Sequence, residues 1–444
     1  MSEEKQPRKA SSVRHTRAIQ RDHTKQPISA PSAKEIKDRL IEIVHPATLA
    51  QADYFRSLGL RERTLGLTTM VAFVLEMIWR QIGGVCEMTR VIQTAAVLWA
   101  SPKKVNQQAV SERLTSLPAQ IFLNILQSIL PLMQQRWAER KRPLPPEIAW
   151  AQAHYSETQL VDGSTLDALI RKIGLLKDQP QNPLAGRITA LLNLSSRLPT
   201  QIWYEADPKA HDQRFWPQIL AVLKAKSLLI FDMGYINFGV FAQLTQAQVT
   251  FITRAKSNLV DTLERALIKT DMVHDALVWI GTKDNRQLLR LVEVSYCGAW
   301  YRYLSNELDD KRLPTAYLVA LYWQRWRIED AYAIVKRLLR LAYFWRGSQN
   351  AVEIQVWATW LLYAVLVDLT DCVAEALNQP FAAISIEMVY RSLYFFTQAR
   401  HRGQAHDVVA YLATNAKLLG VVKRKRKSER PSPLKQIPIL TAAG

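Results

Sequence analysis

One stretch of the sequence places four side chains of complementary chemistry at helical spacing. Residues 321–338 contain no Pro or Gly, and their apolar periodicity predicts one continuous helix. Four side chains lie along it at offsets of 0, 3, 7 and 14: Tyr322, Arg325, Glu329 and Lys336. At about 100° per residue, these offsets fall within roughly 60° of one another. A carboxylate between two cations suits an acid that holds a metal ion while its neighbours hold a polyanion. A solvated helix face with an Arg325–Glu329 pair is the simpler alternative.

Two further acids stand where predicted strands end. Asp162 ends the strand TQLVDGS and Asp232 ends the strand SLLIFDMG, each followed at once or nearly so by a glycine. In open α/β sheets, ligands bind at the carboxyl ends of strands. Phosphoryl transfer on DNA without a protein nucleophile requires two divalent metal ions, and Mg²⁺ prefers hard oxygen ligands. Asp162, Asp232 and Glu329 together match that requirement.

Each candidate also has a purely structural interpretation. Asp162 precedes a helix-start signature, Ser164-Thr165-x-Asp167, and such an Asp is often a turn or N-cap residue. Asp232 before a glycine is equally typical of a turn. His211 opens the next predicted helix, where a capping histidine competes with a metal ligand. Asp330 points roughly 100° away from Glu329 and is expected to be an exposed partner for a nearby cation.

The composition favours nucleic acid as the partner. Lys and Arg number 58 against 39 Asp and Glu, which gives a formal charge of +19. An anionic membrane is the competing partner, but the apolar stretches at 70–78 and 356–367 read as core helices rather than membrane spans. The three cysteines are far apart, which argues against a disulfide framework or a zinc site and favours the cytoplasm. The sequence also lacks P-loop, HExxH and GxSxG motifs.

The pattern along the chain predicts seven segments. Helical periodicity dominates before residue 150, short β-rich runs follow to residue 256, and a second β-leaning stretch precedes the 321–338 helix. Residues 93–100 (QTAAVLWA) are expected to be helical, and a basic run at 136–142 closes the first helical region. The expected segments are a disordered basic arm (1–34), a helical domain (35–150), the first part of an α/β domain (151–256), a β-rich insertion (257–312), the second part of the α/β domain (313–375), a helical carboxy-terminal region (376–430) and a flexible tail (431–444).

These motifs resemble a known family. The spacing Tyr322-x2-Arg325-x3-Glu329-x6-Lys336 is similar to the Tyr-Arg-Glu-Lys signature of the insertion-sequence-four family of bacterial DDE transposases. LVDGSTL and LLIFDMGYIN resemble the first and second aspartate motifs of that family, and VTFITRAK resembles the strand that follows the second. The resemblance covers roughly residues 155–370.

The resemblance implies an α/β fold: an RNase H-like mixed-sheet catalytic domain with a β-rich insertion, flanked by an all-helical amino-terminal DNA-binding domain and a helical carboxy-terminal segment. It implies that Asp162, Asp232 and Glu329 bind two Mg²⁺ ions, with Mn²⁺ able to substitute. It also implies that Tyr322, Arg325 and Lys336 contact DNA near the cleavage site.

The implied partners are double-stranded DNA, both the terminal inverted repeats and the target, and a second copy of the chain in a synaptic homodimer. The implied location is the cytoplasm of a bacterium, at the nucleoid, without a membrane. Some members of the family stack a flipped base on an aromatic ring. Trp323, Trp326 and Trp345 are the nearest candidates here, and we expect them to pack in the core instead.

The leading hypothesis is therefore a cut-and-paste transposase that cleaves DNA at the element ends and transfers the strand into target DNA. Two alternatives remain. The chain could be a catalytically inactive, transposase-derived DNA-binding protein, although such a relic has no reason to keep three acids. It could also be a general RNase H-like nuclease, although a plain nuclease does not require a basic helical module at 35–145.

Overall fold

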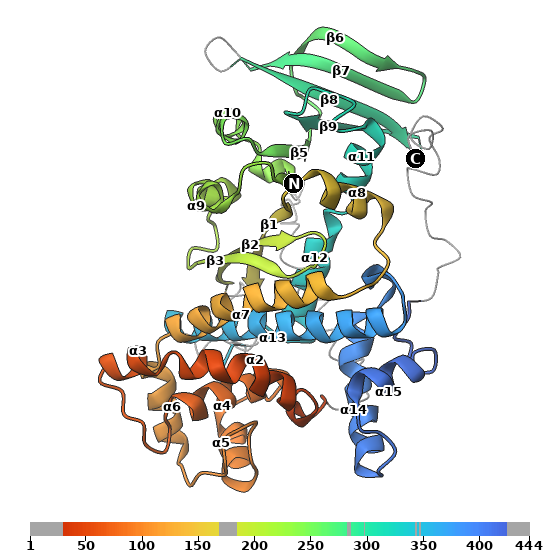
Figure 1. Ribbon diagram of the computed structural model, residues 1–444. Helices are drawn as coiled ribbons and strands as arrows, with labels where there is room; N and C mark the ends of the chain where they lie inside the picture. Colours follow the sequence, from red (N-terminus) through yellow and green to blue (C-terminus); the bar gives the residue numbers. More distant parts are fainter. Residues whose placement is uncertain are drawn as a thin grey trace, which may run out of the picture.

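A mixed β-sheet with helices on both faces forms the centre of this protein. The computed structural model describes residues 30–167, 184–281, 286–296, 298–341, 344–345 and 348–423. The expected basic arm up to residue 29 and the expected tail at 431–444 lie outside these ranges. Ordered structure begins before residue 35, because Ala33 is fully buried in the core. Figure 1 shows the sheet above a layer of long helices, with further helices below that layer.

The sheet has nine strands, in the order β3-β2-β1-β4-β5-β9-β8-β7-β6. The three strands β1, β4 and β5 are parallel to one another, and both flanks of the sheet pair antiparallel. The bounds are β1 (Thr158–Asp167), β2 (Leu184–Asn193), β3 (Pro199–Glu205), β4 (Leu228–Phe231), β5 (Thr250–Arg254), β6 (Asp261–Lys269), β7 (Val273–Ile280), β8 (Gln287–Tyr296) and β9 (Ala299–Ser305). The predicted strands at the positions of β1 to β5 are confirmed.

Alternation along the strands sends neighbouring side chains to opposite faces of the sheet. Leu160 and Ile230 face the large core shared with the long helices, whereas Val161 and Phe231 face a second core. Helices α9 (Trp216–Val222) and α10 (Phe238–Gln246) cover the second face. All four residues of β4 are buried, as expected for a parallel strand covered on both sides.

The amino-terminal region is helical, as predicted. Its elements are η1 (Ala33–Glu35), α2 (Lys37–Leu49), α3 (Ala52–Ser57), α4 (Leu67–Trp79), α5 (Val85–Thr94), α6 (Gln107–Ser116), α7 (Gln120–Glu139) and α8 (Pro146–His154). The helix expected at 93–100 is wrong: α5 ends at Thr94, and Val97 and Ala100 form an isolated β-bridge. A tight turn with Leu98 at φ 49° closes that bridge.

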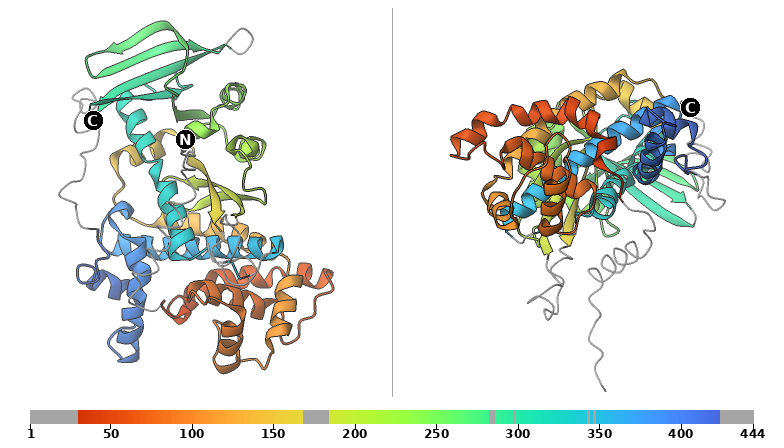
Figure 2. Two further views of the ribbon diagram at one scale, coloured as in Figure 1. Left: turned by 180° about the vertical axis from the view of Figure 1, so that it is seen from behind. Right: turned by 90° about the horizontal axis from the view of Figure 1, so that it is seen from below.

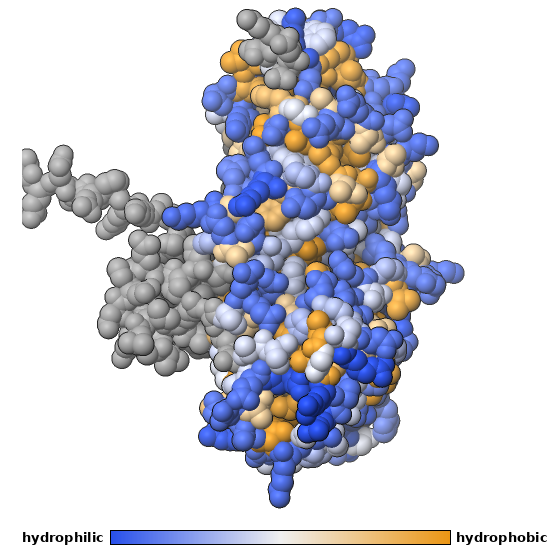
Figure 3. Space-filling model, turned by 90° about the vertical axis from the view of Figure 1, so that its left-hand side faces the viewer, coloured by the Kyte–Doolittle hydropathy of each residue, from blue (hydrophilic) through white to orange (hydrophobic). Residues whose placement is uncertain are grey.

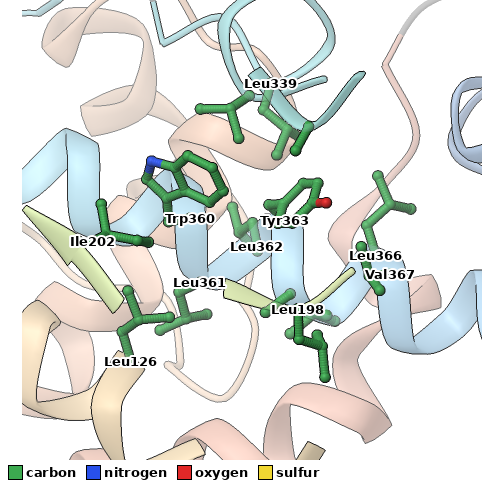
Figure 4. Packing of buried hydrophobic residues seen from close by; sticks show 14 of the residues in the cluster. Leu126, Leu198, Ile202, Leu339, Trp360, Leu361, Leu362, Tyr363, Leu366 and Val367 are labelled. Atoms are coloured by element: carbon green, nitrogen blue, oxygen red, sulfur yellow. The ribbon is translucent and has the colours of Figure 1, made fainter. Parts of the chain in front are cut away.

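The longest helix, α13 (Gln349–Ala376), is the main element of the large core. It is long and apolar enough to cross a membrane by length and composition, but 94% of its most apolar window is buried inside the protein. Trp360 and Tyr363 of α13 pack among Leu126 of α7, Ile202 of β3 and Leu339 (Figure 4). The expectation of a core helix here is confirmed.

Two arginines of the basic run at 136–142, which spans the end of α7, are paired with acids of α13. Arg140 pairs with both Asp368 and Asp371 of α13, and Arg142 pairs with Asp371. Arg39 of α2 also bonds to Asp368, at 2.9 Å. These ion pairs fix the end of α7 and the start of α2 to the same side of α13.

The helix predicted over residues 321–338 is not continuous, and this prediction is corrected. Two residues separate α11 (Thr315–Trp323) from α12 (Trp326–Ala333). A π-helical segment, η6 (Ile334–Leu338), follows α12 directly. The junction tightens because Arg325 N donates to Tyr322 O and Ile328 N donates to Arg325 O, both bonds to the third residue back. Mid-helix tightening and π-bulges often mark functional positions. Seen from behind, this path runs from the β6–β9 end of the sheet down to α13 (Figure 2).

The β-leaning stretch before α11 contains four strands that extend the central sheet. A fully buried ion pair, Arg290–Asp275, joins β8 to β7, and Arg290 also donates to Leu313 O at 2.6 Å and Thr315 Oγ1 at 3.1 Å. This extension is therefore tied directly to the first turn of α11. The proposal that it is an insertion, and the seven segment boundaries, stay predictions.

The carboxy-terminal region is helical up to residue 414. It contains η7 (Phe381–Ala383), α14 (Ile386–His401) and α15 (Val408–Thr414), which pack beside α13. The surface in Figure 3, on the α9 and α10 side, is mostly hydrophilic with hydrophobic residues in separate patches.

Candidate active site

The two strand acids meet at one edge of the parallel core of the sheet. The last parallel pair of β1 and β4 is Val161 with Phe231, so Asp162 and Asp232 both follow that pair directly. Their backbones are therefore held side by side by the register of the two strands. This is the edge at which ligands bind in α/β sheets.

Asp162 does not end its strand, contrary to the prediction. Strand β1 continues to Asp167 because β2 continues to pair with it, with Asp162 opposite Ala190. The predicted helix start at Ser164-Thr165 is wrong for the same reason. Asp162 stands where β1 loses its parallel neighbour β4, and its Oδ1 accepts the Gly163 N–H at 2.8 Å.

Asp232 does follow the end of its strand. It caps the short helix η4 (Met233–Tyr235), and its Oδ1 accepts the Met233 N–H at 2.6 Å. The turn interpretation is therefore correct, and the turn occupies only one of the two carboxylate oxygens of Asp232. Oδ2 of Asp232 has no hydrogen bond to any part of the chain that the structure describes.

Arg325 lies between the acids and connects the helix to the strand. Its Nη1 is 3.5 Å from Asp162 Oδ2, and its Nη2 is 2.9 Å from Glu329 Oε1. The tight junction between α11 and α12 directs the guanidinium toward β1. Its Nε is buried and makes no hydrogen bond within the described ranges, so the donor fork is only partly used.

The pKa shifts show that the three acids share one electrostatic environment. The pKa of Asp162 is raised to about 7: burial is the largest cause, Arg325 and the Gly163 N–H bond lower it, and the charges of Asp232 and Glu329 raise it. Burial also raises the pKa of Glu329, and Asp232 adds to that rise. Burial lowers the pKa of Arg325, but Tyr322 and the three acids outweigh it, so the net shift is upward.

Lys336 and Tyr322 reach the same edge from the two ends of the interrupted helix. Lys336 Nζ donates to Thr165 O at 2.7 Å and to Ser164 Oγ at 3.2 Å, both on β1. Tyr322 is buried beside Arg325, with the guanidinium 6.0 Å from its ring, and burial raises its pKa to about 12. The structure thus directs Arg325 and Lys336 toward β1 although the helix is broken, whereas the Tyr322 ring packs against Tyr303 of β9.

Tyr332 is a residue of this site that the sequence reasoning missed. Its hydroxyl accepts the Ala190 N–H at 3.0 Å and donates to Asp162 O at 2.7 Å, so it bridges two residues paired across β1 and β2. Tyr332 is three residues after Glu329 and therefore lies on a neighbouring face of α12. That spacing is the only signal in the sequence that could have found it.

The three tryptophans do not share the expected core position. Trp326 is 60% exposed, and its ring lies 5.3 Å from the Arg325 guanidinium, so the core interpretation of Trp326 is wrong. It begins α12 at the tight junction, where its side chain turns to solvent. Trp323 and Trp345 are partly buried against the large core. His211 caps η3 (Asp212–Phe215) through Nδ1, as expected for the capping interpretation.

The donor chemistry of the site fits a hard divalent cation. Asp232 and Glu329 each use one oxygen for a hydrogen bond to the protein and keep a second, whereas Asp162 uses both, Oδ1 for the Gly163 N–H and Oδ2 for Arg325 at 3.5 Å. Carboxylate oxygens are the ligands that Mg²⁺ prefers. Within the described residues, no group of three His, Cys, Asp or Glu side chains is close enough to hold a metal ion as it stands. The Arg325 guanidinium supplies the compensating positive charge among these acids.

Comparisons with known proteins connect this site to transposases. Residues 185–365 match the family described as the transposase DDE domain. The chain is 30% identical over 155 residues to the protein named "Putative transposase y4zB" of Sinorhizobium fredii, over 32% of this chain and 43% of that relative. The chain thus spans less than half the length of the curated relative that it matches. Among solved structures it is similar to a piggyBac transposase in a synaptic complex with hairpin DNA, at 12% identity and a TM-score of 0.43, covering 92% of this chain and 91% of that one.

The matched segment contains part of the site. Asp232, Arg325 and Glu329 lie inside residues 185–365, whereas Asp162 precedes them. The parallel pairing of β1 with β4 joins Asp162 to the matched segment.

Proposed function

We propose that this protein is a DDE transposase of the insertion-sequence-four type, which cleaves DNA at the ends of its element and transfers the freed strand into target DNA. One observation carries the proposal: the Arg325 guanidinium pairs with Asp162 and Glu329, and Asp232 stands beside Asp162 after the last pair of β1 and β4, in a chain whose residues 185–365 match the transposase DDE family. The order of β3-β2-β1-β4-β5, with β2 antiparallel, supports an RNase H-like catalytic domain.

Asp162, Asp232 and Glu329 are proposed to hold two Mg²⁺ ions, with Mn²⁺ as a substitute. When bound, such ions activate the attacking hydroxyl and stabilise the leaving oxygen of the phosphodiester. The remaining carboxylate oxygens supply hard ligands for them. We infer that the cations would make Arg325 available to the DNA, since they would neutralise the acids that it now neutralises.

The residues around the acids suit a DNA backbone. Arg325 offers a planar fork to a phosphate, and Lys336 offers a point charge held near β1. The exposed ring of Trp326 beside Arg325 provides a surface on which an unpaired base could stack. Tyr322 supports Arg325 from the buried side of the junction. A homodimer on paired element ends is part of the same proposal.

The test is cleavage of DNA that carries the ends of the protein's own element. Purified full-length protein with Mg²⁺ or Mn²⁺ is expected to nick these ends and to release a 3′-hydroxyl. Glu329→Gln keeps the size of the side chain and removes its charge, so it should abolish cleavage and leave DNA binding within about threefold. The matched control is Asp330→Asn, because Asp330 is the neighbouring acid, is exposed and pairs with Arg327 at 3.6 Å. Normal cleavage by Glu329→Gln, or equal loss in both variants, would contradict the proposed role of Glu329.

The same assay separates the alternatives. Binding to element ends without cleavage in either metal would favour an inactive DNA-binding protein derived from a transposase. Cleavage that ignores the end sequence would favour a general nuclease.

A further inference from the structure

Both strand acids are accompanied by glycines at positions where the backbone is approached very closely. A Cβ atom on Gly163 would clash with Asp212 Oδ1 and would lie 2.9 Å from Arg187 Nη2. A Cβ atom on Gly234 would lie 3.1 Å from Asp212 Oδ2. The close approach of one carboxylate to both glycines accounts for the absence of a side chain at these two positions.

The group that approaches them is an ion pair formed by residues far apart in the sequence. Arg187 of β2 donates to Asp212 Oδ1 through Nε at 3.1 Å and also through Nη2. Asp212 opens η3, directly after the capping residue His211. Only 17% of the Arg187 side chain and 21% of the Asp212 side chain are exposed. The pair is thus held on both sides, by a strand and by a capped turn.

This ion pair lies on the face of the sheet opposite to the acids. Asp162 is two residues after Leu160, whose side chain faces the core that contains α12, and it turns to the same face. Gly163 is two residues after Val161, whose side chain faces the second core with Phe215 and α9, where Asp212 also lies. The pair therefore cannot contact DNA held beside Arg325, and it touches the acid-bearing backbone from behind.

We propose that Arg187 and Asp212 are positioning residues that hold the backbone segments of Asp162 and Asp232 at a fixed separation. The Asp212 carboxylate fits between Gly163 and Gly234, and Arg187 fixes its orientation from β2. Two carboxylates must be correctly spaced to share divalent ions, and residues behind the ligands set that spacing. This inference rests on the proposed function, because it assigns Asp162 and Asp232 to metal binding.

The test measures Mn²⁺ binding to the full-length protein, by the electron paramagnetic resonance signal of the free ion, without DNA and without a cleavage readout. Asp212→Asn and Arg187→Gln are each expected to weaken Mn²⁺ binding by about tenfold. The double variant should be little worse than either single variant, because both changes break the same pair. DNA binding in the absence of metal should stay within about twofold of the unchanged protein.

The matched control is Asp261→Asn. Asp261 pairs with Arg302 at 3.2 Å, with 25% and 23% of the side chains exposed, so the pair resembles Arg187–Asp212 in burial but lies on the β6–β9 extension. This variant should leave Mn²⁺ binding unchanged. Loss of Mn²⁺ binding equal to that of Asp212→Asn would overturn the positioning role, because it would show only a general effect of breaking an ion pair.

A glycine variant guards against misfolding of the charge variants. Gly163→Ala displaces the Asp212 and Arg187 side chains without removing a charge, and it should weaken Mn²⁺ binding in the same direction. Gly83→Ala is its control, since no atom lies within 4 Å of the added Cβ. Mn²⁺ binding within twofold of normal in both folded Asp212→Asn and folded Gly163→Ala would overturn the inference. If Glu329→Gln still weakens Mn²⁺ binding in that case, the proposed function stands; if Glu329→Gln also has no effect, the metal site itself is wrong.

Discussion

Replacing Tyr332 by Phe tests whether α12 fixes the position of Asp162. The substitution removes one hydroxyl and leaves the buried Ala190 N–H and Asp162 C=O without their shared partner. An unsatisfied buried group costs about 1–3 kcal/mol, so the two together predict a loss of about 2–6 kcal/mol in the free energy of unfolding. Because Asp162 would also shift relative to Glu329, cleavage should fall by about 10–100-fold.

Tyr363→Phe is the matched control for this experiment. Tyr363 and Tyr332 are both buried, and both rings pack edge-on against Trp360. Among the described residues, the Tyr363 hydroxyl bonds to Arg197 O alone, at 3.0 Å and away from the acids. Its loss should cost about 1–2 kcal/mol and leave cleavage unchanged. Urea unfolding measures the stability of each variant, and cleavage of element-end DNA measures its activity.

Two results would contradict this role of the Tyr332 hydroxyl. If Tyr332→Phe were no less stable than Tyr363→Phe, the two bonds of the Tyr332 hydroxyl would not contribute as argued. If Tyr332→Phe were destabilised but cleaved DNA within twofold of normal, the bridge would hold the strands without positioning Asp162.

Two further predictions concern stability. Asp275→Asn leaves Arg290 buried without a carboxylate and should lower the free energy of unfolding in urea by about 3–5 kcal/mol. The double variant Asp275→Leu with Arg290→Met should recover most of that loss. A loss below about 1 kcal/mol in Asp275→Asn would contradict this prediction. Burial raises the pKa of Glu76 from 4.5 to about 7, despite its Arg80 partner. The folded state therefore favours protonated Glu76. The stability that Glu76 contributes is fully present below pH 4.5 and is lost as the pH rises through 7. The free energy of unfolding of Glu76→Gln should be higher than that of the unchanged protein by up to about 3 kcal/mol at pH 8 and by little at pH 5. An equal difference at both pH values would contradict this prediction.

The sequence was informative where local pattern decides the structure. The alternation and bounding residues of the strands around Asp162 and Asp232 predicted β1, β4 and the edge at which both acids stand. The helical spacing of Arg325 and Glu329 predicted their contact. These features depend on residues close together in the chain, so periodicity and turn chemistry could reveal them.

The rest depends on contacts between distant segments. Strand β1 runs past Asp162 because β2 pairs with it there, which no local signal announces. Strand β6 was not predicted, since its sequence DTLERALIK is rich in helix-forming residues and only its pairing with β7 makes it a strand. Asp212 is positioned by Arg187, which is 25 residues away in the chain. The α11–α12 junction contains no Pro or Gly, so its tightening is also invisible in the sequence.

The packing of α7 against α13 has a practical consequence for dividing the chain. A fragment cut near residue 150 would leave Leu126 and its apolar neighbours on α7 facing water instead of α13. The same cut would separate Arg140 from its ion-pair partners Asp368 and Asp371. The amino-terminal helices and the central sheet thus share one interior, and expression trials should treat residues 30–423 as a single folding unit.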